Sequence, residues 1–128
     1  MSKQLVIAIW IARIIAAVIL LQTLFFKFTG AEESKYIFSE LGVEPWGRII
    51  TGILELITTI LLLVPATIGI GAIFGLILMV GAILSHITIF GIEVQGDSGQ
   101  LFIYAVIEFI CCAFLTWKFR EQIPLFRK

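Results

Sequence analysis

The amino-acid sequence predicts an all-α integral membrane protein, a four-helix bundle with a short interfacial helix between its first two spans. Of the 128 residues, 60% are hydrophobic and 14% are charged, whereas soluble domains carry about 25% charged residues. Four stretches reach or approach the roughly 20 apolar residues of a membrane-spanning helix, and they cover residues 5–26, 48–64, 68–90 and 101–117. None alternates polar and apolar residues as the strands of a membrane barrel do. The chain is interpreted as one four-span domain over residues 1–128.

The first span is interpreted as a retained helix rather than a signal peptide, because its apolar run is long, Arg13 interrupts it and no small-residue cleavage site follows. Thr29, followed three residues later by Glu32, forms a capping-box pattern, and Gly42 is a helix stop. A helix of about 12 residues is therefore expected between Thr29 and Gly42. Its amphipathic pattern predicts that it lies in the membrane interface, next to Trp46 as an aromatic anchor.

The loops and basic residues predict the connections and the orientation of the spans. A hairpin at residues 65–67 makes the second and third spans antiparallel neighbours, and residues 96–99 predict a turn followed by a helix N-cap. An even number of spans places both termini on one side of the membrane. The basic residues expected on that side are Lys3, Lys118, Arg120, Arg127 and Lys128, against Lys27, Lys35 and Arg48 on the other. The positive-inside rule then predicts cytoplasmic termini in a multi-pass protein of the bacterial inner membrane.

Composition and residue types exclude several kinds of protein. Nine basic and nine acidic residues leave no net charge to attract nucleic acid, and the hydrophobicity excludes a soluble enzyme. With a single histidine, no metal site is expected. Cys111 and Cys112 are adjacent on one helix and project about 100° apart, so we expect them to be packing residues. Gly71 and Gly75 form a G-x-x-x-G pattern, which predicts close helix packing within the chain or between two copies.

Four ionisable side chains lie within the predicted spans, where each costs about 2.5–3.5 kcal/mol on insertion scales. They are Arg13, Glu55, His86 and Glu108. The helical rise places Arg13 and Glu108 at similar depths. Because an isolated charge in lipid is costly, we expect Arg13 and Glu108 to form a structural ion pair.

The other ionisable residues predict an outward-facing polar pocket on the bundle axis. The second span carries a stripe of polar and small residues, namely Arg48, Thr51, Gly52, Glu55, Thr58 and Thr59. His86 lies only about 6 Å below the outer end of its span, and Lys27 is expected near the same mouth. We therefore predict that Lys27, Arg48, Glu55 and His86 bind a ligand. The alternative is a structural role, for example a histidine satisfied by a backbone carbonyl or a glutamate.

Three short motifs resemble the DoxX-like family of small four-helix membrane proteins. They are Arg13 with Lys27 fourteen positions later, Gly52-x-x-Glu55-Leu56, and Gly81-Ala82 leading to His86. The resemblance covers nearly the whole chain, although Leu24 stands where the family often has glycine. It implies an association with quinol oxidase or thiosulfate:quinone oxidoreductase activity, while related eukaryotic members resemble assembly factors for membrane receptors. It also implies that the family's charged and histidine positions fall on Arg13, Lys27, Glu55 and His86.

The function that the sequence favours is binding of a quinone-like or lipid-like amphiphile as an accessory to membrane redox chemistry. A quinone is therefore the candidate cofactor, and whether the chain is itself an enzyme stays open. The alternative is an assembly factor or interaction subunit whose buried charges are purely structural. The expected partners are the lipid bilayer and either another membrane protein or a second copy of the chain, with no nucleic acid.

Overall fold

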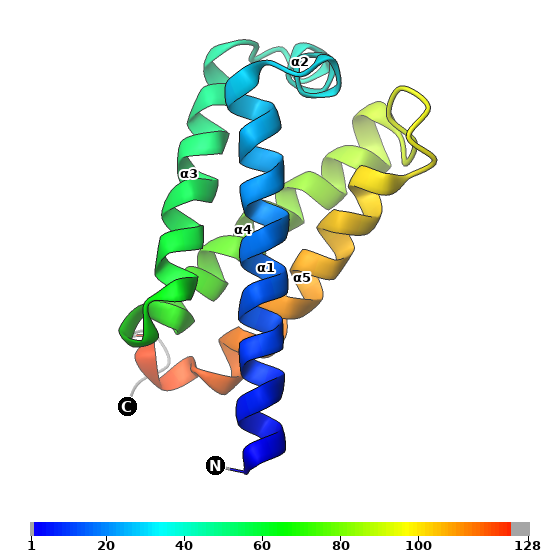
Figure 1. Ribbon diagram of the computed structural model, residues 1–128. Coiled ribbons are helices and arrows are strands. Elements are labelled where there is room, and N and C mark those ends of the chain that lie inside the picture. The colour runs from blue at the N-terminus through cyan, green and yellow to red at the C-terminus, as the bar shows by residue number, and fades with distance from the viewer. Residues whose placement is uncertain (1, 124–128) are drawn as a thin grey trace.

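The computed structural model describes residues 2–123 and consists of helices joined by short loops (Figure 1). The helices are α1 (Lys3–Thr29), α2 (Glu32–Glu40), α3 (Trp46–Leu63), α4 (Ile68–Ser85) and α5 (Gln100–Lys118), with short turns at Pro65–Thr67, His86–Phe90 and Arg120–Gln122. α1, α3, α5 and the stretch Pro65–Phe90, which contains α4, are each long and apolar enough to cross a membrane. The predicted all-α fold with four spans is confirmed.

The four long helices are arranged as two pairs that diverge toward one end. α1 packs mainly on α3, and α4 packs mainly on α5. The pairs converge at the end where α1 begins and α5 ends, and they separate at the opposite end, which α2 crosses (Figure 1).

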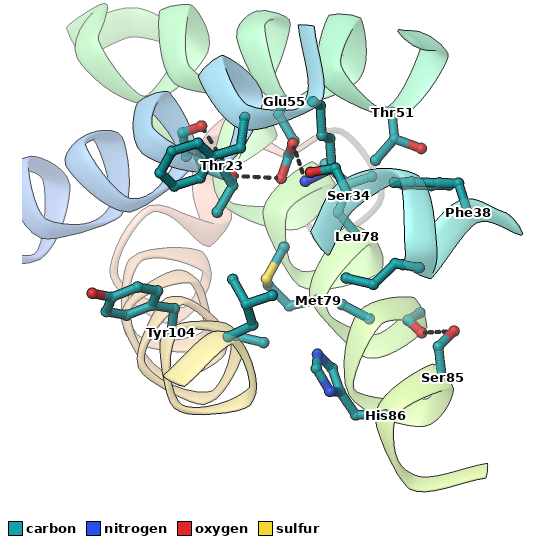
Figure 2. Close-up of a pocket in the computed structure, with 18 of the residues that line it drawn as sticks. Thr23, Ser34, Phe38, Thr51, Glu55, Leu78, Met79, Ser85, His86 and Tyr104 are labelled. Carbon is teal, nitrogen blue, oxygen red and sulfur yellow. Dashed lines mark hydrogen bonds and ion pairs between the residues drawn. The ribbon is translucent and has the colours of Figure 1, made fainter. Parts of the chain in front are cut away.

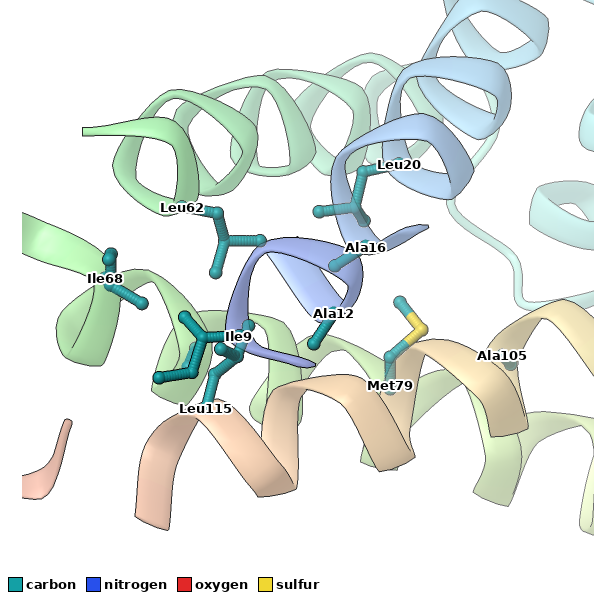
Figure 3. Close-up of a cluster of buried hydrophobic side chains, with 10 residues drawn as sticks. Ile9, Ala12, Ala16, Leu20, Leu62, Ile68, Met79, Ala105 and Leu115 are labelled. Carbon is teal, nitrogen blue, oxygen red and sulfur yellow. The ribbon is translucent and has the colours of Figure 1, made fainter. Parts of the chain in front are cut away.

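A buried apolar cluster joins the pairs where they converge. Its members come from all four long helices and are Ile9, Ala12, Ala16, Leu20, Leu62, Ile68, Ala72, Met79, Ala105 and Leu115 (Figure 3). Gly71 and Gly75 allow α4 to approach its neighbours. A Cβ at Gly71 would come within 2.8 Å of the Leu61 Cβ on α3, and one at Gly75 would collide with Cys112 Sγ on α5. The small residues of the G-x-x-x-G pattern therefore serve packing within the chain.

The outside of the bundle is covered by large apolar side chains. Examples from three helices are Val18, Ile60 and Ile110, all of which are exposed. By contrast, the polar stripe of α3 faces inward, since Arg48, Glu55, Thr58 and Thr59 are buried. A surface covered by apolar side chains, with polar side chains inside, is unfavourable in water but stable in lipid. The protein is therefore a multi-pass membrane protein.

The start of α1 and the end of α5 lie on the same side of the bundle, as an even number of spans requires. α1 begins and α5 ends there (Figure 1), so Lys3, Lys118 and Arg120 share that end. Arg127 and Lys128 also count among the basic residues that predict the orientation, but they lie outside the described residues. That this end is cytoplasmic stays a prediction.

The helix boundaries differ from expectation at two places. Thr29 does not cap the short helix, because it is the last residue of α1, and its hydroxyl donates to the Phe25 carbonyl at 2.8 Å. Gly30, with a φ of 71°, then ends α1, so α2 starts at Glu32 and has 9 residues rather than about 12. At the other place, α4 ends at Ser85 and the third span continues as a π-helical turn, His86–Phe90.

Candidate ligand pocket

A cavity of about 350 Å³ lies between the two helix pairs, and α2 contributes to its lining. α1, α2, α3, α4, α5 and the π-helical turn all contribute to its lining, most of which is apolar. The polar lining residues are Thr23, Lys27, Ser34, Thr51, Glu55, Ser85, His86 and Tyr104 (Figure 2). An apolar cavity with a few inward polar groups is the usual form of a small-molecule site, and this volume is near the lower limit for such sites.

The polar wall of the cavity is an ion pair between α1 and α3. Lys27 Nζ lies 2.9 Å from Glu55 Oε1, and the two side chains are 15% and 3% exposed. The other carboxylate oxygen, Oε2, accepts a hydrogen bond of 3.0 Å from the Thr23 hydroxyl. The carboxylate is thus held by two neighbours from α1, and the pair contributes no net charge to the cavity.

Arg48 does not line the cavity, although the sequence predicted it beside Lys27 at the mouth. Its guanidinium pairs with Glu44, with Nε 2.9 Å from Oε1, and it donates a hydrogen bond to the Lys27 backbone carbonyl. That carbonyl belongs to the last turn of α1, where it also accepts a long hydrogen bond of 3.4 Å from the Gly30 N–H. Arg48 therefore ties the start of α3 to the end of α1 and holds the backbone that carries Lys27.

His86 forms the opposite wall, in the π-helical turn that follows α4. Its side chain is 4% exposed, and Nδ1 lies 3.0 Å from the Gly91 backbone oxygen. Phe90 and Phe102 both meet the imidazole edge to face, with centroid separations of 4.7 Å and 5.5 Å. Hydrogen bonding and stacking together fix the ring orientation, and π-helical turns are frequent at functional sites.

The structure does not form the predicted ion pair between Arg13 and Glu108. The Arg13 guanidinium donates to the backbone oxygens of Leu62 and Leu63, each at 2.9 Å, and it stacks on Trp10, with Cζ 4.0 Å from the ring centroid. These carbonyls end α3, where no further helical N–H can reach them. The nearer partner for Arg13 is therefore the terminus of the helix on which α1 packs.

Glu108 has a different environment, in the core of the bundle. It is fully buried, and its Oε2 accepts a weak hydrogen bond of 3.5 Å from Cys112 Sγ. Oε1 has no hydrogen-bond partner among residues 2–123. Neither Glu108 nor Arg13 lines the cavity, so these two buried ionisable residues lie outside the candidate site.

Sequence reasoning missed several residues that contribute to the cavity. Thr23 lies four residues before Lys27, so helical periodicity places both side chains on one face of α1. Ser34 of α2 is buried and lines the cavity, but an isolated serine in an amphipathic segment gives no comparable signal. Gly81 also lines the cavity, and a Cβ there would meet nothing within 4 Å.

The cavity reaches the outer surface of the bundle along one face of α4. Ile77, Gly81 and Ser85 recur at four-residue intervals, which places them on one face of the helix, and all three line the cavity. Ile77 is 66% exposed. A molecule in the cavity could therefore extend sideways into the lipid that surrounds α4.

The loop before α5 is organised by one carboxylate. Asp97 Oδ1 accepts hydrogen bonds from the backbone N–H groups of Val94 and Gly99, and Oδ2 accepts one from Leu101. Partial burial acts to raise the pKa of Asp97, but the three N–H donors outweigh it and hold the pKa below its ordinary value. The predicted turn and cap at residues 96–99 are confirmed, with Asp97 as the capping side chain.

Comparison with known proteins places this architecture in a family. The profile of the DoxX-like family matches residues 10–114. The chain belongs to the DoxX-like family. The match includes Lys27, Glu55 and His86, so the whole polar part of the cavity lies within the DoxX-like region. No curated protein and no solved structure gave a significant match.

Proposed function

We propose that this DoxX-like protein binds a small amphiphile, quinone-like or lipid-like, as an accessory to membrane redox chemistry. The observation that carries the proposal is the cavity of about 350 Å³, with an apolar lining and polar groups on two opposed walls. Such a cavity matches a molecule with a compact polar head and an apolar body. The redox role follows from what the family resemblance implies.

The lateral face of the cavity supports a ligand that arrives from the bilayer. A head group between the Lys27–Glu55 pair and His86 would leave an apolar tail beside Ile77 and Gly81 on α4. Lipid surrounds that face, so the tail stays in hydrocarbon while only the head group is sequestered. Lys27 and His86 could hydrogen-bond such a head group, and His86 or Glu55 could pass a proton to or from it.

Filling the cavity tests the proposal without removing a charge. Gly81→Leu adds a side chain where a Cβ meets no atom within 4 Å, and leucine is the better helix former by about 0.8–1 kcal/mol. The protein should fold normally and lose the amphiphiles that the wild type retains in native mass spectrometry. Val80→Leu is the matched control, because it adds bulk at the next, exposed position, outside the cavity lining. If Gly81→Leu retains every ligand of the wild type, the binding proposal fails.

The ion pair decides which polar substitutions are informative. His86→Asn keeps an amide N–H that can reach the Gly91 oxygen, so it should fold and lose ligand. Glu55→Gln is a poorer probe of binding, because it leaves the Lys27 ammonium without its carboxylate. A loss of binding by Glu55→Gln alone would therefore mix a change in stability with a change in recognition.

The second candidate function is that of a membrane-protein assembly factor or interaction subunit. It is favoured by Arg13 and Arg48, both buried, whose contacts all lie within the scaffold. This function predicts that neither Gly81→Leu nor His86→Asn changes ligand retention. It also predicts that a partner protein, or a second copy of the chain, copurifies with both variants as with the wild type.

A further inference from the structure

The imidazole of His86 is fixed in one tautomer by its backbone contact. A carbonyl oxygen can only accept a hydrogen bond, so the Nδ1 atom that lies 3.0 Å from the Gly91 oxygen must carry the proton. In a neutral imidazole, the second nitrogen, Nε2, is then an acceptor. The edge contacts with Phe90 and Phe102 oppose rotation of the ring out of this arrangement.

No carboxylate among the described residues forms an ion pair with His86. An imidazolium in a membrane span requires a paired carboxylate, and within residues 2–123 the ion pairs join Lys27 to Glu55 and Arg48 to Glu44. Asp97, in the loop that follows, interacts with His86 electrostatically. It forms no ion pair with the ring, however, and its two carboxylate oxygens accept hydrogen bonds from backbone N–H groups. The ring is therefore neutral, with a lone pair on Nε2.

That lone pair faces the cavity. Figure 2 shows the imidazole of His86 directed toward Met79 and the cavity interior, away from the helix that carries it. Among the described residues, the one hydrogen bond of His86 is made by Nδ1 to the Gly91 oxygen, and none is made by Nε2. On the opposite wall, the Lys27–Glu55 pair is already neutralised. An anionic head group would face the lone pair of Nε2 and find no free positive charge, whereas a neutral donor would satisfy it.

The geometry points to a specific head group: Nε2 of His86 accepts a hydrogen bond from a hydroxyl group of a neutral amphiphile. The site then prefers an alcohol or a phenol to the ether or carbonyl compound of the same size. This inference rests on the proposed binding function, and it names the chemical class of the ligand. It also gives His86 a role in specificity that does not require a change in its protonation.

Matched pairs of ligands test the inference on the intact protein in detergent or nanodiscs. One pair is 4-octylphenol and its methyl ether, and the second is 1-decanol and its methyl ether. Within each pair, size and apolarity are similar, but only the hydroxyl compound donates a hydrogen bond. We expect the wild type to bind the donor of one pair about tenfold more tightly than its ether, which corresponds to one net hydrogen bond. The pair with the larger ratio identifies an aromatic or an aliphatic hydroxyl.

The same pairs are then measured with two variants. His86→Asn retains a donor for Gly91 and removes the acceptor at the position of Nε2, so its donor-to-ether ratio should fall to about one. Leu84→Ala, at an exposed position outside the cavity lining, should keep the wild-type ratio. If His86→Asn does not fold, His86→Gln takes its place, because its amide N–H can also donate to the Gly91 oxygen, and equal binding of donor and ether by the wild type still overturns the inference.

The outcomes separate this inference from the binding function itself. Equal binding of hydroxyl and ether compounds by the wild type overturns the inference and leaves amphiphile binding standing. A ratio that persists in His86→Asn also overturns it, because another group must then recognise the hydroxyl. If the wild type binds none of the four compounds, both the binding function and the inference fail.

Discussion

Replacing Lys27 by methionine and Glu55 by glutamine, singly and together, tests the ion pair that joins α1 to α3. Both substitutions keep similar side-chain volume while they remove one charge each. Lys27→Met leaves a carboxylate that is 3% exposed with the Thr23 hydroxyl as its remaining neighbour. Glu55→Gln leaves an ammonium whose side chain is 15% exposed.

The difference in burial sets the expected magnitudes. Removing one partner of a buried pair costs about 3–5 kcal/mol in unfolding free energy, and Lys27→Met should fall in this range. Glu55→Gln should cost less, about 2–3 kcal/mol, because the long lysine side chain can turn its ammonium toward the nearby interface. In the double variant no unpaired charge is left. Its loss should therefore be smaller than the sum of the single losses by at least about 2 kcal/mol.

The measurement is reversible unfolding in mixed micelles for the wild type, the two single variants and the double variant. Lys35→Met is the control, because Lys35 is exposed and makes no ion pair within the described residues, and it should shift the stability by less than about 0.5 kcal/mol. Strictly additive losses would show that the two charges do not interact in the folded protein. A loss for Lys35→Met equal to that for Lys27→Met would point to a general effect of charge.

Four further predictions use other parts of the molecule. Arg13→Met should lower the unfolding free energy by about 2–3 kcal/mol in the same assay, because two carbonyls at the end of α3 lose a charged donor. An unchanged unfolding free energy would mean that water takes the place of the guanidinium. Gly75→Ala should destabilise by about 1–3 kcal/mol through its collision with α5, and the matched Gly81→Ala should not. Asp97→Ala should cost about 1–2 kcal/mol at pH 7. Since the folded pKa of Asp97 is lowered, its stabilisation is complete above 3.8 and fades as the pH falls below that value, so the gap to the wild type should close there. If the termini are cytoplasmic, an impermeant reagent applied from outside should label Ser39→Cys, which is exposed on α2, and not Ser2→Cys; the reverse pattern would invert the orientation.

Much of the fold follows from local properties of the chain. A run of about 20 apolar residues must satisfy its own backbone hydrogen bonds in lipid, so length and hydropathy are enough to predict a spanning helix. Helical periodicity also predicts which face is buried, and the α3 stripe around Glu55 does face the interior. The G-x-x-x-G pattern at Gly71 and Gly75 also predicts close helix packing, because only small residues permit close backbone approach.

The composition of the cavity depends on how the helices contact one another, and the sequence predicted it only in part. Lys27, Glu55 and His86 do line one cavity, since depth along each helix was sufficient to place them at the same level. Arg48 has the right depth but points to the end of α1 instead. Helical spacing fixes the height and face of a side chain, but it does not fix which neighbouring helix that face meets.

The partners of Arg13, Glu108 and His86 were decided by tertiary structure alone. Because α1 packs on α3, the Arg13 guanidinium reaches the unpaired carbonyls at the end of that helix before it can reach Glu108 on α5. The π-helical turn after α4 brings the Gly91 oxygen to His86 Nδ1 and so leaves Nε2 as the acceptor in the cavity. Amino-acid type and spacing specify which groups are polar and how deep they lie in the membrane. Hydrogen bonding depends on distances of about 3 Å and on direction, and these are set only when the helices have packed.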